Sequence, residues 1–307
     1  MRIELVEVGP RDGLQSESVV LPTATKIALI ERLIQAGLRR IEVASFVNPK
    51  RVPQMADAEA VLAGLPKHEG VSYIGLVLNM KGLERARAAG CDAIGMAIVA
   101  SETFNRRNQG VSTEESIAAW REIANLARSV GIAPNITIST AFGCPFEGEI
   151  APDRVLDIAL RCAESDPVEI ALADTIGVAV PTQVEDLFGR LRERLPAMPL
   201  RGHFHNTRNT ALANVHAAIA AGVRAIDSSV GGIGGCPFAP AATGNVPTED
   251  VLYMLNRMGI ETGVSIDQMI DTARWLEQQI GKTVPGMLIK AGNFPNGPRA
   301  ICGHVQA

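Results

Sequence analysis

The chain has 307 residues, of which 47% are hydrophobic and 20% are charged, and its net charge at pH 7 is −4. A chain of this length and apolar content can bury a large core without disulfides, which excludes a disordered, collagen-like or low-complexity protein. The acidic balance, with a pI near 5.8, argues against a nucleic-acid or membrane-surface protein, since such proteins normally carry a basic stripe.

Cysteine usage and hydropathy indicate the compartment. The five cysteines are scattered and include no CxxC pair, a pattern typical of a reducing compartment. The first residues, MRIELVEVGPRDG, lack the apolar core of a signal peptide, and the longest apolar runs are far shorter than the ~20 residues of a membrane span. We therefore expect a soluble, cytoplasmic enzyme with no membrane or nucleic-acid partner.

Short β-branched runs alternate with helical patterns from the N-terminus to about residue 260. In chain order, the predicted strands cover residues 3–8, 40–45, 71–78, 93–99, 134–141, 168–173, 200–205 and 225–230. The predicted helices lie between and after them, at 22–37, 54–64, 80–89, 113–130, 152–165, 181–195, 209–221 and 247–259. Gly37 ends the first helix, and Ser112 with Glu115 forms a capping box for the helix from 113.

Strict alternation of eight strand–helix units predicts parallel strands joined by right-handed crossovers. A count of eight favours an α/β fold of the (β/α)8 TIM-barrel type over an open doubly wound sheet, which would want a glycine-rich phosphate turn after its first strand. That turn reads GPRDGLQ instead. We predict a catalytic barrel over 1–262, and over 263–307 a C-terminal extension, with a helix at 265–280 and a tail, that packs on the same domain.

Functional side chains of such barrels lie at the carboxyl ends of the strands and in the loops that follow. Polar and ionisable residues are dense at those ends here, while the strands themselves are apolar. They are Arg11, Asp12, Glu42, Ser45, Asp174, His203 and His205, together with the loop GGIGGCPFAPAATGN at 231–245.

His203 and His205 are the sharpest feature. Side chains two residues apart on a strand point the same way, so both imidazoles would converge at the mouth of the barrel, as a metal site requires. Two ordinary polar histidines at a strand end are the alternative interpretation. With the carboxylate of Asp12 and an amide oxygen, the pair would make a mixed nitrogen and oxygen site that suits Mg²⁺ or Mn²⁺ better than Zn²⁺.

The glycine-rich loop carries Cys236. The segment GGIGG can adopt unusual backbone angles and move easily, and the alternative interpretation is a tight strand-to-helix connection. It does not match the GxGxxG fingerprint of dinucleotide-binding proteins, because Cys236 and Pro237 stand where the helix should start. A thiol on a loop over a metal centre would be a proton donor, whereas we interpret Cys91, Cys162 and Cys302 as structural.

Six segments resemble the 3-hydroxy-3-methylglutaryl-CoA lyase family of the DRE-TIM metallolyases. They are GPRDGLQSE at 9–17, IEVASFVNPKRVPQMAD at 41–57, FGCPFEG at 142–148, ADTIGVAVP at 173–181, HFHN at 203–206 and GGIGGCPFAPAATGNVPTEDVLYML at 231–255. Isopropylmalate synthase, homocitrate synthase and 4-hydroxy-2-oxovalerate aldolase share the Arg-Asp element (Arg11-Asp12) and the HxH element (203–205), but not the cysteine of the glycine-rich loop, Cys236.

The resemblance assigns roles to individual residues. It implies a divalent cation, Mg²⁺ or Mn²⁺, no nucleotide cofactor, and CoA as part of an acyl-CoA substrate. The implied metal ligands are Asp12, His203, His205 and Asn245. The implied catalytic residues are Arg11 and Cys236, with Glu42 and Asp174 shaping the site. The expected substrate contacts are Arg11, Gln15, Ser45, Thr175 and Arg208, and the expected assembly is a homodimer or higher homo-oligomer.

The implied reaction is a retro-Claisen cleavage between C2 and C3 of 3-hydroxy-3-methylglutaryl-CoA, giving acetyl-CoA and acetoacetate. His203 or Asp12 would take the hydroxyl proton, Arg11 would meet the enolate oxygen and Cys236 would protonate the enolate carbon. Alternatives are a different 3-hydroxyacyl-CoA, a related 2-oxo acid aldolase or synthase, and a catalytically silent barrel.

Two departures from the family pattern concern the substrate. Ser18 stands where the family's best-studied branch has a lysine, and Asn206-Thr207-Arg208-Asn209 stands where that branch has Asp-Thr-Tyr-Gly. A moved contact to an anionic part of the substrate, a different acyl-CoA, and neutral loop variation are the three interpretations.

Overall fold

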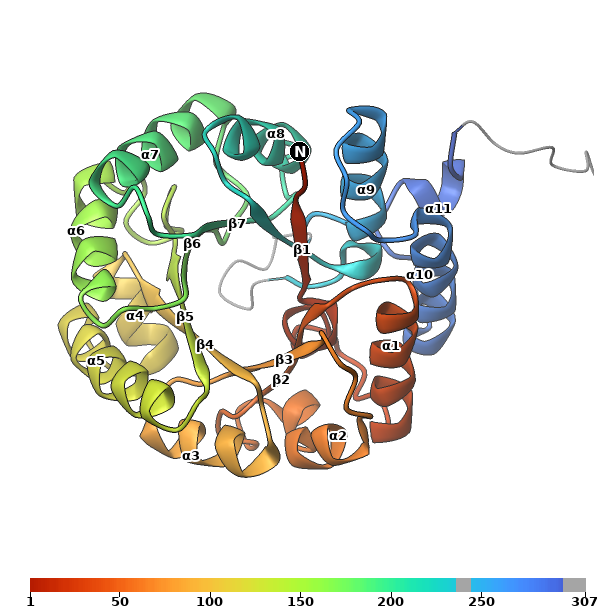
Figure 1. Cartoon of the computed structure of the whole chain (residues 1–307), viewed down its shortest axis with the longest axis horizontal. Helices are drawn as coiled ribbons and strands as arrows, with labels where there is room; N and C mark the ends of the chain where they lie inside the picture. The colour runs from red at the N-terminus through yellow and green to blue at the C-terminus, as the bar shows by residue number, and fades with distance from the viewer. Residues whose placement is uncertain (236–243, 295–307) are drawn as a thin grey trace, which may run out of the picture.

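Eight parallel strands close into a barrel in the order β1 to β8 in this computed structural model, which describes residues 1–235 and 244–294 (Figure 1). The strands are β1 (Glu4–Glu7), β2 (Arg40–Ser45), β3 (Ser72–Leu76), β4 (Ala93–Val99), β5 (Ala133–Ser139), β6 (Glu169–Asp174), β7 (Leu200–Phe204) and β8 (Ala225–Ser228). Because β1 pairs with both β2 and β8, the barrel has no free sheet edge. The predicted (β/α)8 barrel is confirmed.

Helices follow the strands and surround the barrel (Figure 1). They are α1 (Thr23–Gln35), α2 (Ala58–Gly64), α3 (Met80–Ala89), α5 (Thr113–Ser129), α6 (Pro152–Ala163), α7 (Pro181–Arg194), α8 (Ala211–Ala220) and α9 (Thr248–Arg257). Each overlaps the helix predicted at its place, and Ser112 and Glu115 form the predicted capping box at the start of α5. Short helical turns, η1 (Gly9–Gly13), η2 (Pro53–Met55) and η3 (Val230–Gly232), lie in the loops after β1, β2 and β8.

A further helix, α4 (Glu102–Gln109), lies between β4 and α5 and is absent from the predicted elements. Its sequence, ETFNRRNQ, lacks the apolar repeat that marks an amphipathic helix. Polar contacts hold it instead: Ser101 Oγ accepts the Phe104 N–H at 3.1 Å, and the buried Asn105 Nδ2 donates to Ser116 Oγ at 2.8 Å. A Ser N-cap is the signal that could have located this helix.

Apolar side chains form two separate clusters, because successive residues of a strand point to opposite sides of the barrel wall. The larger cluster lies between the strands and the helices and includes Leu5, Ile41 and Ile94. The smaller one, inside the barrel, consists of Val6, Val8, Ile74 and Ala93. Charged side chains from β2, β6, β7 and β8 occupy much of the remaining interior; they are Arg40, Glu169, Arg201 and Asp227.

The C-terminal helices α10 (Ile266–Ile280) and α11 (Leu288–Ala291) lie beside α9, and α10 also packs against α1 (Figure 1). The Ser265 N–H donates to Ala36 O at 2.7 Å, and the Arg32 guanidinium lies 4.8 Å from the Trp275 ring centroid. Gly37 has φ +111° and a Cβ there would lie 2.4 Å from Gly263 O, so only glycine allows this approach. Residues 295–307 of the predicted extension lie outside the described residues.

Among the helices that the structure describes, none combines the length and the hydropathy that a membrane span requires.

Glu7, at the end of β1, joins β1 to the loops around α9. Its Oε1 accepts the N–H groups of Gly9 at 2.8 Å and Val230 at 2.9 Å, and its Oε2 accepts the Thr248 hydroxyl at 2.7 Å. Burial raises the pKa of this carboxyl to about 7, although the three hydrogen bonds lower it. Glu7 therefore carries its proton over part of the acidic range in the folded protein.

Replacement Glu7→Gln is expected to flatten the pH dependence of stability. Between pH 4.5 and about 7 the carboxyl of the unfolded chain loses its proton while that of the folded protein keeps it. The contribution of Glu7 to the free energy of unfolding therefore falls as pH rises and is level above pH 7. The glutamine oxygen can accept both N–H groups and its NH₂ group can donate to the Thr248 oxygen, so the fall should shrink by roughly 3 kcal/mol. Urea unfolding at pH 5 and pH 8 measures it. An exposed control, Glu122→Gln on α5, should keep the wild-type slope; an equal slope in Glu7→Gln contradicts the prediction.

Candidate metal centre and active site

Asp12 enters the mouth of the barrel on a π-helical turn directly after β1. In η1 the N–H groups of Asp12 and Gly13 both donate to Val8 O, at 2.7 and 3.2 Å. Such turns re-aim side chains and occur frequently at functional sites. The turn also contacts β2, which brings Arg11 and Asp12 towards Glu42.

Asp12, His203 and His205 form a group that could hold a metal ion. One ligand atom from each lies within 4.8 Å of the other two, and the imidazole centroids are 5.2 Å apart. The structure thus brings together the three side chains that the sequence predicts to converge. His205 Nδ1 is buried and has no hydrogen-bond partner among the described residues, which would be costly for an idle nitrogen and suits a ligand site. Nitrogen and carboxylate donors in this ratio are compatible with Mg²⁺, Mn²⁺ or another divalent ion.

Asn245, the fourth predicted ligand, lies next to this group. Its backbone forms a bridge with His205, and its Nδ2 donates to Asp12 Oδ2 at 2.8 Å and to Ile233 O at 3.2 Å. With Nδ2 engaged, Oδ1 is the amide atom left to accept or to ligate. Gly234 makes the placement possible, because a Cβ there would lie 2.6 Å from Asn245 Nδ2.

Arg11 lies between two carboxylates. Its Nη1 is 2.6 Å from Asp12 Oδ1 and its Nη2 is 2.6 Å from Glu42 Oε2, while no residue in the described part of the chain accepts from its buried Nε. Burial works to raise the pKa of Asp12, but the charges of Arg11, His203 and His205 outweigh it and lower the pKa to about 2. Burial also raises the pKa of Glu42, against the opposing effect of Arg11. Arg11 is thus a cation held on two sides by carboxylates, and its Nε–H is a donor that no described residue engages.

Burial and the charge of His203 lower the pKa of His205 to about 4, so its imidazole is neutral at pH 7 and keeps a lone pair for a ligand bond. His203 differs because Asp227 accepts from its ring: burial works to lower its pKa, yet the hydrogen bond and charge of Asp227 produce a net increase.

Asp174 shapes the loop after β6. Its carboxylate accepts the N–H groups of Val178 and Ala179 at 2.9 and 3.0 Å, and burial raises its pKa. Thr175 Oγ1 accepts the N–H of Thr140, a buried residue with φ +54° that is strained for a β-branched side chain. Thr140 Oγ1 in turn accepts the Ser101 N–H at 3.3 Å, so the loops after β4, β5 and β6 are tied together.

The other predicted substrate residues have different surroundings. Gln15 Oε1 and Ser45 Oγ are buried and find no hydrogen-bond partner within residues 1–235 and 244–294, so Oε1 could accept from a ligand and Oγ could accept from or donate to one. Arg208 is exposed, and its Nη1 donates to Ile176 O at 3.1 Å and Gly177 O at 2.9 Å. Cys236 and Cys302 lie outside the described residues.

Asp227 and Arg201 are buried polar residues of the barrel that the sequence analysis missed. Asp227 Oδ2 lies 3.0 Å from His203 Nδ1, and Arg201 Nη1 donates to Asp227 Oδ1 at 2.8 Å. Two signals were available: a charged residue within each of the apolar runs LRGHFH and AIDSSV, and the two-residue spacing of Arg201 and His203, which places both on one face of the strand.

The chain is similar to known proteins over most of its length. Residues 2–276 match the HMGL-like protein family. Hydroxymethylglutaryl-CoA lyase of Pseudomonas mevalonii is 44% identical, with 91% of this chain and 93% of that protein covered. (R)-Citramalyl-CoA lyase of Chloroflexus aurantiacus is 42% identical, with 94% and 95% covered. The structure of an HMG-CoA lyase from A. baumannii, in complex with coenzyme A and 3-methylmalate, superposes with a TM-score of 0.93 at 39% identity and covers 97% of each chain.

Replacement His205→Ala should weaken binding of Mn²⁺ by on the order of 100-fold or more, because a direct ligand is expected to matter at least as much as an outer-shell partner. Electron paramagnetic resonance titration of chelator-treated protein measures free Mn²⁺ directly. His216→Ala, at an exposed position of α8, is the matched control and should bind like the wild type. Equal affinities for all three proteins would remove His205 from the centre.

Proposed function

This chain belongs to the HMGL-like family, and on that premise we propose that it is a divalent-metal-dependent carbon–carbon lyase that cleaves 3-hydroxy-3-methylglutaryl-CoA to acetyl-CoA and acetoacetate. The observation that carries the proposal is the convergence of Asp12, His203 and His205 within 4.8 Å, beside a buried arginine. The relatives that cleave C–C bonds of CoA thioesters align with nearly the whole chain.

The proposed metal ligands are Asp12, His203, His205 and Asn245. Mg²⁺ or Mn²⁺ suits an amide oxygen, a carboxylate and two imidazoles. A divalent ion at these residues supplies Lewis-acid chemistry, which lowers the pKa of a bound hydroxyl group and orients the substrate.

Arg11 is the proposed electrostatic catalyst. Retro-Claisen cleavage places negative charge on the thioester oxygen as the enolate forms, and a preoriented cation in a site shielded from water stabilises that charge strongly. Glu42 and Asp12 hold the guanidinium on both sides, so it needs no reorganisation during the reaction. Its Nε–H, for which the described residues provide no acceptor, is a candidate donor to substrate.

Two residues are candidates for the base that removes the C3 hydroxyl proton. A histidine that ligates through one nitrogen and donates through the other has no lone pair left for a proton, which disfavours His203 because its Nδ1 is engaged by Asp227. Asp12 keeps free lone pairs, and its low basicity is offset when the hydroxyl proton has itself been made more acidic.

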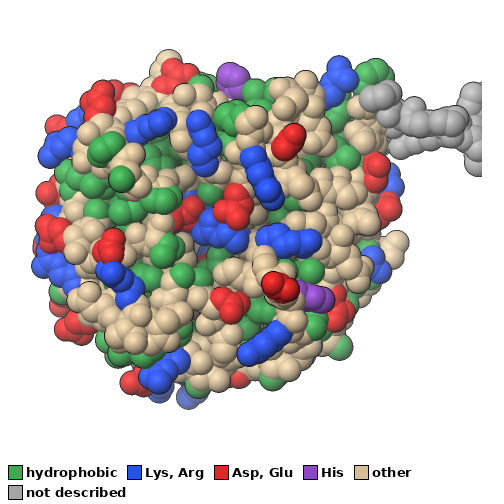
Figure 2. All heavy atoms as spheres, viewed as in Figure 1, with side chains coloured by type: hydrophobic (Ala, Val, Ile, Leu, Met, Phe, Trp, Pro, Cys, Tyr) green, Lys and Arg blue, Asp and Glu red, His purple; other side chains and the backbone are tan. Residues whose placement is uncertain are grey.

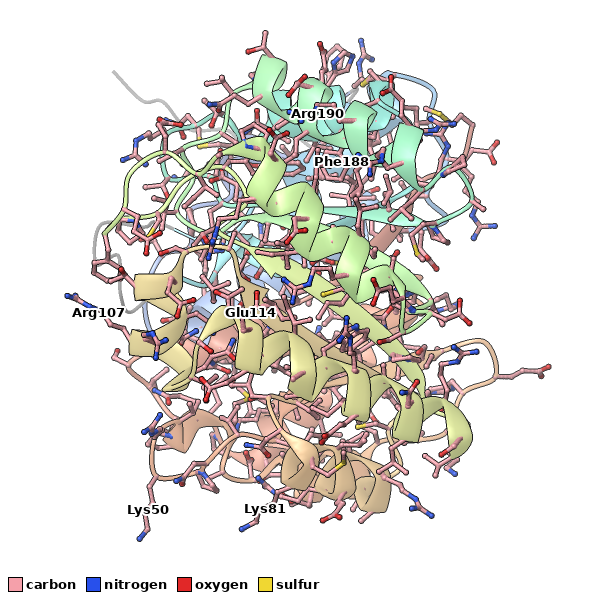
Figure 3. All side chains as sticks on the ribbon, turned by 90° about the vertical axis from the view of Figure 1, so that its left-hand side faces the viewer. Lys50, Lys81, Arg107, Glu114, Phe188 and Arg190 are labelled. Carbon is pink, nitrogen blue, oxygen red and sulfur yellow. The ribbon has the colours of Figure 1, made fainter. Side chains whose placement is uncertain are left out.

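Other parts of the chain fit an acyl-CoA substrate. Lys50, in the loop after β2, and Arg107, on α4, project from the same edge of the molecule in Figure 3 and are candidate contacts for CoA phosphates. The Arg107 guanidinium lies 4.3 Å from the Phe146 ring centroid, which presents a flat face beside a cation. Cys91, Cys144 and Cys162 are free thiols, which supports a cytoplasmic location. A homodimer or higher homo-oligomer is the proposed assembly.

(R)-Citramalyl-CoA is the second candidate substrate, because a relative named for it is 42% identical over 300 residues. Both compounds are 3-hydroxyacyl-CoA thioesters with a terminal carboxylate, so the same cleavage applies to both. Arg208, in the segment that departs from the family pattern, is a candidate for reading that carboxylate.

An assay of the metal-depleted and Mg²⁺-restored protein tests the proposal. We expect acetoacetate and acetyl-CoA from 3-hydroxy-3-methylglutaryl-CoA only after Mg²⁺ is restored. Parallel incubation with (R)-citramalyl-CoA identifies the preferred substrate from kcat/KM. Cleavage of that compound alone would keep the mechanism and change the substrate, whereas no release of acetyl-CoA from either would refute the lyase.

Replacement Cys236→Ala should abolish turnover, because the enolate carbon would lack its proposed proton donor, and it should leave Mn²⁺ affinity near the wild-type value. A kcat loss of about 10²–10⁴-fold is typical for a missing general acid. The control Cys162→Ala removes a buried thiol of α6 and should keep most of the activity of the folded enzyme. A near-normal kcat in Cys236→Ala would refute this role.

A further inference from the structure

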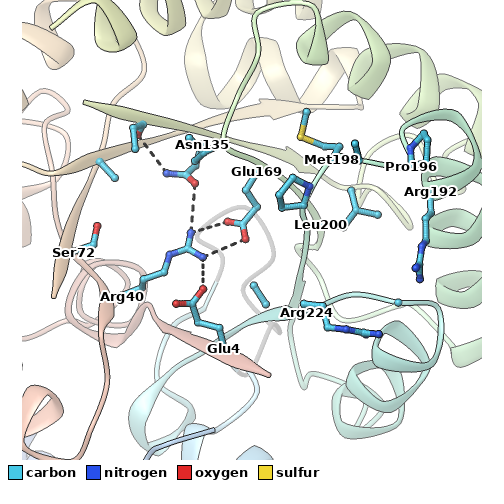
Figure 4. A pocket seen from close by; sticks show the side chains of 17 residues that line it. Glu4, Arg40, Ser72, Asn135, Glu169, Arg192, Pro196, Met198, Leu200 and Arg224 are labelled. Carbon is cyan, nitrogen blue, oxygen red and sulfur yellow. Dashed lines mark hydrogen bonds and ion pairs between the residues drawn. The ribbon is translucent and has the colours of Figure 1, made fainter. Parts of the chain in front are cut away.

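A chain of alternating charges runs through the interior of the barrel. It begins at the amino ends of the strands, in a pocket of about 590 Å³ lined by residues that include Glu4, Arg40, Asn135 and Glu169 (Figure 4). Acidic and basic side chains gather at the centre of this face in Figure 2. The opposite end of this chain of charges is His203, at the candidate metal centre.

Neighbouring side chains in this chain of charges lie within hydrogen-bonding or ion-pair distance of each other. Arg40 contacts Glu4 and Glu169, both at 2.8 Å, and Arg201 Nε lies 3.0 Å from Glu169 Oε1. Arg201 Nη1 then donates to Asp227 Oδ1 at 2.8 Å, and Asp227 Oδ2 meets His203 Nδ1 at 3.0 Å. Charges are compensated pairwise, which is what allows Glu169, Arg201 and Asp227 to be 4–6% exposed.

Strand register places Asp227 where it can reach both neighbours. On the paired strands β7 and β8, His203 is the direct partner of Asp227, and Arg201 lies two residues earlier on β7, with its side chain on the same face. Each oxygen of the Asp227 carboxylate therefore has its own partner: Oδ1 accepts from Arg201 and Oδ2 faces the His203 imidazole.

We propose that Asp227 is a positioning residue for the metal ligand His203, and that Arg201 holds Asp227 in place. This inference rests on the metal centre of the proposed function. An ionised carboxylate can only accept a hydrogen bond, so the imidazole proton is placed on Nδ1 and the lone pair of Nε2 is left for the ion. The contact also fixes the ring against rotation. None of the residues that the structure describes holds His205 Nδ1 in this way.

Replacement Asp227→Asn tests the assignment with almost no change of shape. The amide has one oxygen for two donors; Arg201 can only donate, so the oxygen should turn to Arg201 and the NH₂ group to His203. The NH₂ group would donate to Nδ1 and move the ring proton to Nε2, where it blocks the ligand bond. We expect Mn²⁺ affinity to fall about 10–100-fold. In metal-free protein with ¹⁵N-labelled histidine, at an alkaline pH where the imidazole is neutral, NMR should show Nδ1–H of His203 in the wild type and Nε2–H in the variant.

Two further variants separate positioning from a general loss of structure. Arg201→Lys keeps the charge but loses the planar fork, so it should weaken Mn²⁺ binding less than Asp227→Asn does. Asp250→Asn is the matched control: its carboxylate is 6% exposed and accepts the N–H groups of Met287 and Leu288, away from the metal group. It should keep wild-type Mn²⁺ affinity even where it lowers thermal stability.

The outcomes distinguish the inference from the proposed function. Unchanged Mn²⁺ affinity in folded Asp227→Asn, an Nε2–H tautomer in the wild type, or an equal loss in Asp250→Asn each overturns the positioning role and leaves the lyase intact. A wild-type protein that binds no Mn²⁺ overturns the metal centre itself, and the inference with it.

Discussion

Arg11 lies between the carboxylates of Asp12 and Glu42, 2.6 Å from each, in a barrel mouth where all three side chains are largely shielded from water. Two carboxylates so close together would repel each other and would not both stay ionised without this cation. The arginine thereby sets the charge state of Asp12, and Asp12 in turn meets the amide of Asn245. The π-helical turn after β1 positions Asp12, and the backbone bridge between His205 and Asn245 positions the amide that meets it.

The same need for charge compensation explains the unusual barrel interior. TIM barrels usually fill this space with layers of branched apolar side chains, whereas the apolar cluster that the described residues form inside this barrel is small. Arg40, Glu169, Arg201 and Asp227 fill the space beside it with alternating charges. Such an arrangement is poor evidence for stability, because desolvation offsets much of the attraction. It does fix the positions of these side chains, since each one lies between two oppositely charged or hydrogen-bonding partners.

Many of the candidate site residues were predictable from sequence because a parallel barrel has a simple rule. The carboxyl ends of the strands meet at one mouth, and alternate residues of a strand share a face. Asp12 and the two histidines could therefore be placed together from the residues alone, and the family resemblance added Asn245. The rule does not report which polar residues are buried deeper along the axis, so Asp227 and Arg201 were missed. Helix α4 was missed because polar contacts to its cap and to Asn105, rather than an apolar stripe, hold it.

The order of eight strand–helix units, the preference for a closed barrel and the residue types of the candidate metal centre could all be predicted before the fold was known. These follow from hydrophobic periodicity and local capping, which act between neighbours in the chain. The partners of individual side chains follow instead from the three-dimensional fold: Arg11 bridges Asp12 and Glu42, Asp227 faces His203, and Arg208 donates to the loop after β6. Those contacts depend on strand register and on the electrostatic cost of burying charge, and both are set by residues distant in the chain.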